Sequence, residues 1–455
     1  MPQDFNRDCA SEINDPNMHL GRLKDYQGIF NFLNQPFFSV TPETPLMREY
    51  NQFCDDIAKV FESNLRYYVS WKDIHPLRNL IGHILTENWR SYSNGKLPNR
   101  KLTRYAKIFT DPTNGWWVRI KNIIQTCKTS KQPLPGLAHA SIGDIDRAFQ
   151  EFKRENPPQV SVCPKVFIRK SNPKAEDLQS FKGVSDRDTC PRMVTLASRG
   201  LSVETSDPYK LKDDITDKTQ GPGAALNSLG GMIARNAAVA FHMHPDSLLP
   251  VLYGIDTPIP RMCTNLLEYC KNHKFETYQF TNKFLVYGFG YLRPRNIETL
   301  PQLQALVRQI DNNISKYVLG MQWVRCEFAK VWQLQVFLMA ADLSPRHSFI
   351  PNAGEKQQRA ILCKNISKTL LVNQYKAVIQ LACMRQEKVV HLTRVGQGVF
   401  RNDSSIMIDV LEVVLREAQG YDVHIYLEWD SWQEDLNIVK AKNPHLQFKW
   451  QTLYK

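Results

Sequence analysis

Residues 389–403 read VVHLTRVGQGVFRND and join a short apolar run to a loop with two glycines and then to a helix. The apolar run is typical of a strand that is buried inside a sheet. Gly396 and Gly398 lack a Cβ atom, so the backbone there can approach a ligand closely or take a positive φ. Asn402 and Asp403 are suitable N-cap residues for the apolar helix that follows. Backbone N–H groups at such a turn suit a phosphate, although a tight structural turn explains the glycines equally well.

The same alternation of short apolar runs and helical segments extends through the C-terminal two-thirds of the chain. Apolar residues at helical spacing predict helices at 370–385 and 404–418, between predicted strands. Strands that are apolar on both faces require helices on both sides of the sheet, which predicts an α/β domain of three α/β/α layers over residues 161–455. The predicted strands are 166–168, 193–196, 284–287, 336–339, 389–392 and 423–426.

Residues 1–160 follow a different pattern. Their apolar residues recur mostly at helical spacing, as in the stretch 57–65, which predicts a helical N-terminal domain. Pro157, Pro158 and Pro164 interrupt this pattern, because proline does not continue a helix interior and favours extended backbone in the residue before it. We therefore place the domain boundary at residue 160.

The composition is that of a globular protein, because 455 residues of which 42% are hydrophobic can bury a sizeable core. Ten cysteines are scattered without any C-x-x-C pair, which indicates reduced thiols in a cytosol-like compartment. The first thirty residues lack the apolar core of a signal peptide, and no apolar run approaches the length of a membrane span. We therefore expect a cytosolic protein that does not span a membrane.

The formal net charge of +13 bears on partners and not on the fold. The densest basic stretch, residues 96–107, could contact phosphates, but a run of charges is more often a solvated face. No recognisable nucleic-acid module accompanies this stretch. We therefore expect no nucleic-acid partner.

A second informative segment, residues 213–223, reads DDITDKTQGPG and leads into a helix rich in small residues. Pro222 suits the first turn of that helix. Gly221 and Gly223 permit the close approach of another backbone or of a flat ligand. The alternative interpretation is an ordinary small-residue helix that packs on the sheet, with Leu226 in its buried stripe.

Taken together, the two glycine segments resemble the macrodomain superfamily, in particular macrodomains related to poly(ADP-ribose) glycohydrolase and those of bacterial effectors. The resemblance consists of six short matches that follow one another in the order of the family pattern. This sequence departs from the pattern at Arg199, Gly290 and Gln397. The matching stretches are 197–200, 217–222, 235–236, 288–291, 336–338 and 396–403.

The resemblance implies a macrodomain fold that binds ADP-ribose and an enzyme, an ADP-ribosylhydrolase, that removes mono-ADP-ribose from a modified protein side chain. Cleavage of the polymer is not implied, because the glutamate pair that follows the glycine loop in poly(ADP-ribose) glycohydrolases is absent. Arginine is the linkage that we expect. The implied ligand-binding residues are Thr219, Gln220, Gly221, Pro222, Gly396, Gln397, Gly398, Val399, Phe400 and Asn402.

The candidate catalytic residues are Asp217, then Asp214 and Asp213, because they directly precede the second glycine segment. Hydrolysis of the glycosidic bond to ADP-ribose needs an oriented water and a group that stabilises oxocarbenium character, and carboxylates serve both needs. An acidic cluster can also pair with the guanidinium of an arginine-linked substrate. No metal or cofactor is required. The alternative is an ordinary polar loop whose acids favour the helix N-terminus.

The implied partner is a mono-ADP-ribosylated protein, with ADP-ribose as the product ligand. The likeness to bacterial effectors adds delivery into a host cell without a Sec signal peptide as a second possible location. Two other classes of function stay open: a non-catalytic ADP-ribose reader, and an interaction protein that uses the fold as a scaffold. Two glycine loops favour a ligand-binding protein over a scaffold, and the acidic cluster favours a hydrolase over a reader.

Overall fold

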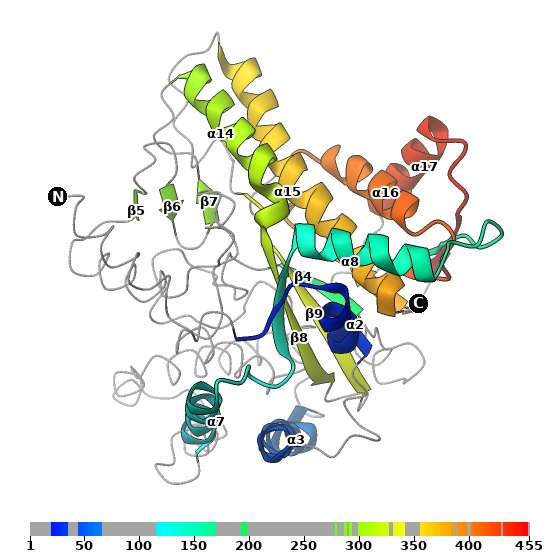
Figure 1. Ribbon diagram of the computed structural model, residues 1–455. Helices are drawn as coiled ribbons and strands as arrows, with labels where there is room; N and C mark the ends of the chain where they lie inside the picture. Colours follow the sequence, from blue (N-terminus) through cyan, green and yellow to red (C-terminus); the bar gives the residue numbers. More distant parts are fainter. Residues whose placement is uncertain are drawn as a thin grey trace.

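The computed structural model shows a mixed α/β protein with a nine-stranded, mostly parallel sheet and a separate three-stranded sheet (Figure 1). All structural statements concern the residues that the structure describes. No helix among them combines the length and the hydropathy that a membrane span needs. The described residues are 20–34, 44–65, 115–169, 193–197, 278–279, 286–288, 291–293, 299–326, 331–341, 355–385, 389–397, 402–428 and 431–453.

The large sheet has one antiparallel strand, the third in the spatial order, and every other neighbouring pair is parallel. Five of the six runs predicted as strands overlap strands of this sheet, and residues 286–287 of the sixth run lie in the small sheet. Spatial order in the large sheet is β1 (Arg22–Leu23), β2 (Leu137–Ser141), β8 (Val318–Cys326), β9 (Val331–Leu338), β4 (Met193–Ala197), β10 (Val389–Leu392), β11 (His424–Glu428), β3 (Lys165–Arg169) and β12 (Lys449–Leu453). The small sheet contains β5 (Tyr278–Gln279), β6 (Val286–Gly288) and β7 (Tyr291–Arg293).

A layer of helices covers one face of the large sheet (Figure 1). Three helices connect β9 to β10, β10 to β11 and β11 to β12, all in the same direction along the sheet, so right-handed crossovers place them on one face. They are α15 (Lys356–Arg385), α16 (Ile406–Glu417) and α17 (Ser431–Lys442), and α15 also contacts α2 (Tyr26–Asn34), α8 (Ile142–Glu155) and α14 (Leu300–Asn313). The short helix η2 (Ile314–Lys316) follows α14, while α3 (Pro45–Leu65) and α7 (Trp116–Ser130) contact each other.

The two faces of the sheet differ in polarity. The face toward the helices carries aliphatic core residues such as Leu334 and Val336. The other face carries buried polar residues, although only one of them, His391, lies in a run that was predicted to be an apolar strand. On it the rings of Phe167, Tyr426 and His391 stack across three strands at centroid distances of 4.7 and 4.9 Å. The buried polar residues of this face are His139, Gln322, Gln333, Gln335 and His391.

Two strands of the large sheet, β1 and β2, come from residues 1–160, for which the sequence predicted helices. Pattern reasoning missed β2 because its sequence, LAHAS, is short and contains none of the β-branched or aromatic residues that favour strands. The helices α2 and α8 of the same segment share one hydrophobic core with α15 and α16. The basic stretch 96–107 lies outside the described residues.

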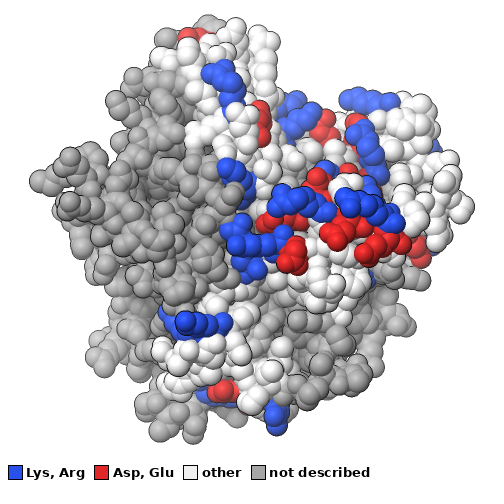
Figure 2. Space-filling view, in the orientation of Figure 1, with Lys and Arg blue, Asp and Glu red and all other residues white. Residues whose placement is uncertain are grey.

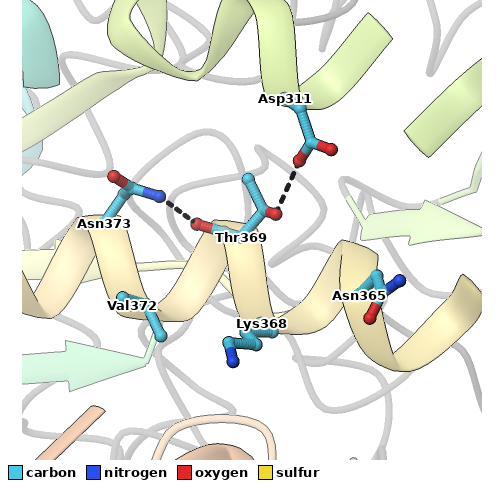
Figure 3. Close-up of a pocket in the computed structure, with 6 residues that line it drawn as sticks. All are labelled: Asp311, Asn365, Lys368, Thr369, Val372 and Asn373. Carbon is cyan, nitrogen blue, oxygen red and sulfur yellow. Dashed lines mark hydrogen bonds between the residues drawn. The ribbon is translucent and has the colours of Figure 1, made fainter. Parts of the chain in front are cut away.

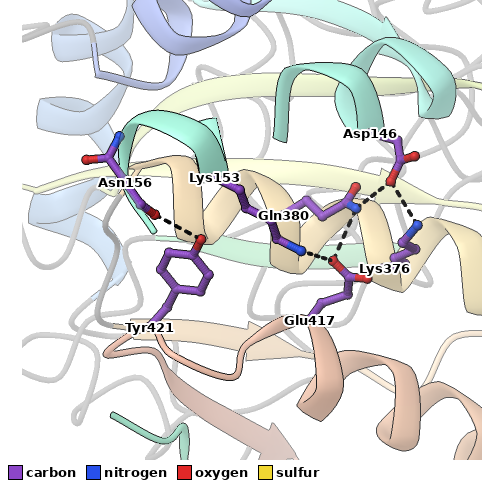
Figure 4. Close-up of polar contacts among 7 residues, drawn as sticks. All are labelled: Asp146, Lys153, Asn156, Lys376, Gln380, Glu417 and Tyr421. Atoms are coloured by element: carbon purple, nitrogen blue, oxygen red, sulfur yellow. Dashed lines mark hydrogen bonds and ion pairs between the residues drawn. The ribbon is translucent and has the colours of Figure 1, made fainter. Parts of the chain in front are cut away.

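Polar contacts tie α8 to α15 and α16 (Figure 4). Asp146 accepts hydrogen bonds from Lys376 Nζ at 2.8 Å and from Gln380 Nε2 at 2.7 Å. Glu417 accepts from the same Gln380 amide at 3.3 Å and pairs with Lys153 at 3.7 Å. Figure 2 shows basic and acidic side chains side by side over this region, so the positive net charge is not gathered there into a basic patch.

The carboxylate of Asp146 makes stability depend on pH. Burial raises its pKa, but hydrogen bonds from Gln380 and Lys376 outweigh burial and lower the pKa below 3.8. The native state therefore keeps this group ionised at a pH where the unfolded chain is protonated, and its contribution to stability is lost as the pH falls through the folded pKa. We expect Asp146→Asn to lower the free energy of unfolding by about 1 kcal/mol at neutral pH, and the difference from wild type to shrink below about pH 4.

Thermal melts of wild type and Asp146→Asn between about pH 7 and pH 3 measure this difference. Arg416→Gln is a matched control, because it removes an ion pair with Glu412 on the surface of α16 while leaving Asp146 intact. A stability difference between wild type and Asp146→Asn that stays constant over this pH range would contradict the lowered pKa of Asp146 as its cause.

Candidate functional site

The carboxyl ends of β9, β4 and β10 lie next to one another at one edge of the large sheet. From β10 the chain continues through α16 to β11 on one side, whereas the chain after β4 rejoins this sheet at β8, on the other side. Strand connections therefore diverge between β4 and β10. In open α/β sheets, ligands bind outside the carboxyl ends of the strands at such a switch point.

The β4 and β10 strands separate at this point. Their backbone pairing ends at Val194 and His391, whereas β4 stays paired with β9 up to Ala197. Beyond it, the N–H of Thr393 donates to Thr195 Oγ1 at 2.9 Å, and the Thr393 hydroxyl donates to the Thr195 carbonyl at 3.0 Å. Side-chain hydroxyls thus replace a backbone partner just before the glycine loop leaves β10.

Gly396 has a positive φ of +82°, which is one of the two reasons for a glycine that the sequence suggested. A Cβ atom at this position would lie 2.6 Å from Ala340 Cβ and 2.7 Å from Asn402 Nδ2, so no larger residue fits without a shift of its neighbours. The Gly396 carbonyl accepts a hydrogen bond from the Asn402 N–H at 3.1 Å, which joins the two ends of the loop. Within the described part of the chain, the backbone N–H groups of Gly396 and Gln397 donate no hydrogen bond, as an anion site requires.

The side chain of Asn402 is buried and holds the loop to its neighbours. Its Nδ2 donates to the Ala341 carbonyl at 3.2 Å, and its Oδ1 accepts from Ser367 Oγ at 3.2 Å. We expected Asn402 or Asp403 to cap the next helix, but α16 begins at Ile406. Asp403 instead accepts a hydrogen bond from the Ser405 N–H at 2.9 Å in the turn before it.

Charges near the loop are balanced within the protein. Asp403 pairs with Lys364 at 3.0 Å. Burial raises the pKa of Asp403, but hydrogen bonds from Ser405 and Lys364 outweigh it and lower the pKa. Arg394 donates to Asp435 on α17 at 2.7 Å, and its guanidinium lies 4.7 Å from the centre of a tryptophan ring. Since Asp435 engages the Arg394 guanidinium, we assign binding of an anion to the backbone of the loop.

Three of the predicted site residues, Gly396, Gln397 and Asn402, are placed by the structure, and they lie together at the carboxyl edge. Sequence reasoning did not identify the polar side chains that hold them there. The sequence does hold a signal for such side chains, because a Gln or Ser that is buried in an apolar helix rarely lacks a hydrogen-bond partner. The other predicted residues lie outside the described residues: Asp213, Asp214, Asp217, Thr219, Gln220, Gly221, Pro222, Gly398, Val399 and Phe400.

A separate cavity of about 320 Å³ lies between α14 and α15 (Figure 3). Its carboxylate, Asp311, accepts a hydrogen bond from Thr369 at 2.7 Å, and its ammonium group, Lys368, pairs with Asp409 at 3.0 Å. Both charged groups thus have partners in the protein, and neither belongs to a glycine segment. We therefore place the candidate site at the glycine loop. The residues that line the cavity are Asp311, Asn365, Lys368, Thr369, Val372 and Asn373.

This chain matches no family model, no curated protein and no solved structure. The assignment of a candidate site rests on the geometry at the carboxyl ends of β4, β9 and β10.

Proposed function

We propose that this protein is an ADP-ribosylhydrolase of the macrodomain type, which removes mono-ADP-ribose from a protein side chain. The observation that carries the proposal is the position of the Gly396 loop at the carboxyl ends of β4 and β10, just past the point where their backbone pairing ends. A diphosphate there would receive hydrogen bonds from the backbone N–H groups of Gly396 and Gln397. The missing Cβ of Gly396 lets this backbone pack against Ala340 and Asn402 at a positive φ.

The proposed chemistry places the acids of the second glycine segment beside the distal ribose of the ligand. Support comes from connectivity, because the chain that carries Asp213, Asp214 and Asp217 follows β4, whose carboxyl end neighbours the glycine loop. In this scheme Asp217 orients and deprotonates a water that attacks the anomeric carbon as the bond to the side-chain nitrogen breaks. The leaving group takes up a proton, and ADP-ribose is released.

Arginine is the proposed linkage, because a cluster of three carboxylates would pair with its guanidinium. A serine linkage offers no such cation. The non-catalytic reader is the second candidate function, and it needs the glycine loop but not the acids at 213, 214 and 217. The two functions differ in one observable, the release of free ADP-ribose from a modified protein.

Release of ADP-ribose from matched proteins with arginine-linked or serine-linked ADP-ribose tests the proposal. We expect release from arginine to be at least about tenfold faster, since a charge-assisted pair contributes more than a neutral contact. Calorimetric titration with ADP-ribose is measured alongside, with AMP as the control ligand that lacks the diphosphate. Binding without release would leave the reader, and neither binding nor release would refute both functions.

A further inference from the structure

The end of β10 is held by one buried hydroxyl group from α15. The Tyr375 hydroxyl donates to the Thr393 carbonyl and accepts a hydrogen bond from the Val395 N–H at 3.1 Å. The same N–H also lies 3.1 Å from the Thr393 carbonyl, so the chain makes a three-residue γ-turn with Arg394 at its centre. The next residue after this turn is Gly396. The Tyr375 hydroxyl therefore bonds both ends of the turn that precedes the glycine loop.

Two other residues of α15 bind the neighbouring segments. The Gln374 amide donates to the Met339 carbonyl at 2.8 Å and accepts from the Met339 N–H at 2.8 Å, just past the end of β9. Ser367 bonds the far end of the glycine loop at Asn402. All three side chains are buried. One rigid helix thus sets the spacing between the end of β9, the end of β10 and the glycine loop.

We infer that Tyr375 is a positioning residue for the anion site, in that its hydroxyl fixes the γ-turn that directs the Gly396 and Gln397 N–H groups toward the ligand. This inference rests on the proposed function. Burial raises the pKa of Tyr375, although the Val395 N–H and Arg394 lower it, so the hydroxyl stays protonated at neutral pH and can donate and accept at once. A phenyl ring at this position keeps the packing and loses both hydrogen bonds.

The test is Tyr375→Phe, compared with Tyr421→Phe as the matched control. Tyr421 donates to the Asn156 carbonyl at 3.3 Å at the junction of α8 and α16, where it takes no part in the glycine loop (Figure 4). We expect Tyr375→Phe to weaken ADP-ribose binding about tenfold and to raise KM by the same factor, with kcat changed less than about twofold, since the loop binds ground state and transition state alike. The Tyr421→Phe protein should keep wild-type affinity.

Hydrogen exchange of the Val395–Gln397 amides in the ligand-free proteins gives a readout that does not depend on the proposed function. We expect the Val395 amide to exchange at least about tenfold faster in Tyr375→Phe than in wild type, because it loses the hydroxyl acceptor and keeps only the Thr393 carbonyl of the γ-turn. Unchanged exchange together with unchanged ADP-ribose affinity would overturn the inference. If wild type fails to bind ADP-ribose while the exchange of this turn still rises, the proposed function fails, and the role of Tyr375 in the turn stands.

Discussion

Gly396→Val is expected to abolish detectable ADP-ribose binding and to lower the free energy of unfolding by about 2–4 kcal/mol. Two costs add. The backbone at φ +82° disfavours any residue with a Cβ, most of all a β-branched one. The new Cβ would also lie 2.6 Å from Ala340 and 2.7 Å from the Asn402 amide, which must then release its bond to Ala341 or move the loop.

Gly28→Ala is the matched control for this substitution. Gly28 lies inside α2, where a Cβ would meet only the end of the Asp25 carboxylate at 3.1 Å, and alanine favours the helix by roughly 1 kcal/mol. Urea unfolding gives the stability of both variants, and calorimetry gives their affinity for ADP-ribose. A folded Gly396→Val protein that binds ADP-ribose as wild type does would remove this loop from the ligand site.

Much of the parallel part of the sheet could be predicted because its strands are short apolar runs between helices. The runs at 166–168, 193–196, 336–339, 389–392 and 423–426 all lie in the large sheet. Strand β2 could not be predicted, because its residues are alanine, histidine, leucine and serine. It becomes a strand only through its pairing with β8. The polar face of the sheet was missed for a related reason. Gln333 and Gln335 alternate with apolar residues on β9, but they lie before the predicted run at 336–339.

The glycine loop could be predicted because the backbone conformation that it requires depends on a single residue. A glycine suits either close approach or a positive φ because of backbone sterics at one residue, and Gly396 has the positive φ. The side chains that hold the loop in place make tertiary contacts, from Tyr375 to Val395 and from Ser367 to Asn402. No spacing in the sequence encodes these contacts. Asn402 illustrates the difference. The sequence suggested a helix N-cap, but the side chain of Asn402 is buried and bonds Ala341 and Ser367, which follows only from the approach of α15 and β9.

The largest effect that we expect on catalysis is that of Asp217→Asn, which should lower kcat for arginine-linked substrate by about a thousandfold. The proposed role of this carboxylate is to orient and deprotonate water, and an amide of the same size cannot accept the proton. The affinity for ADP-ribose should not fall together with kcat. Removing a negative charge near an anionic ligand should leave ADP-ribose affinity unchanged or make it tighter, within about tenfold.

Single-turnover release of ADP-ribose and calorimetry, measured on the same preparation, separate these two effects. Asp214→Asn is the companion variant, because Asp214 is the second candidate and a smaller loss there would rank the two acids. A fall in kcat with retained affinity places Asp217 in the transition state, since an interaction made only there lowers kcat and leaves ground-state binding in place. Wild-type turnover in both variants would show that these carboxylates do not perform the chemistry, and Asp213 alone would then remain from the acidic cluster.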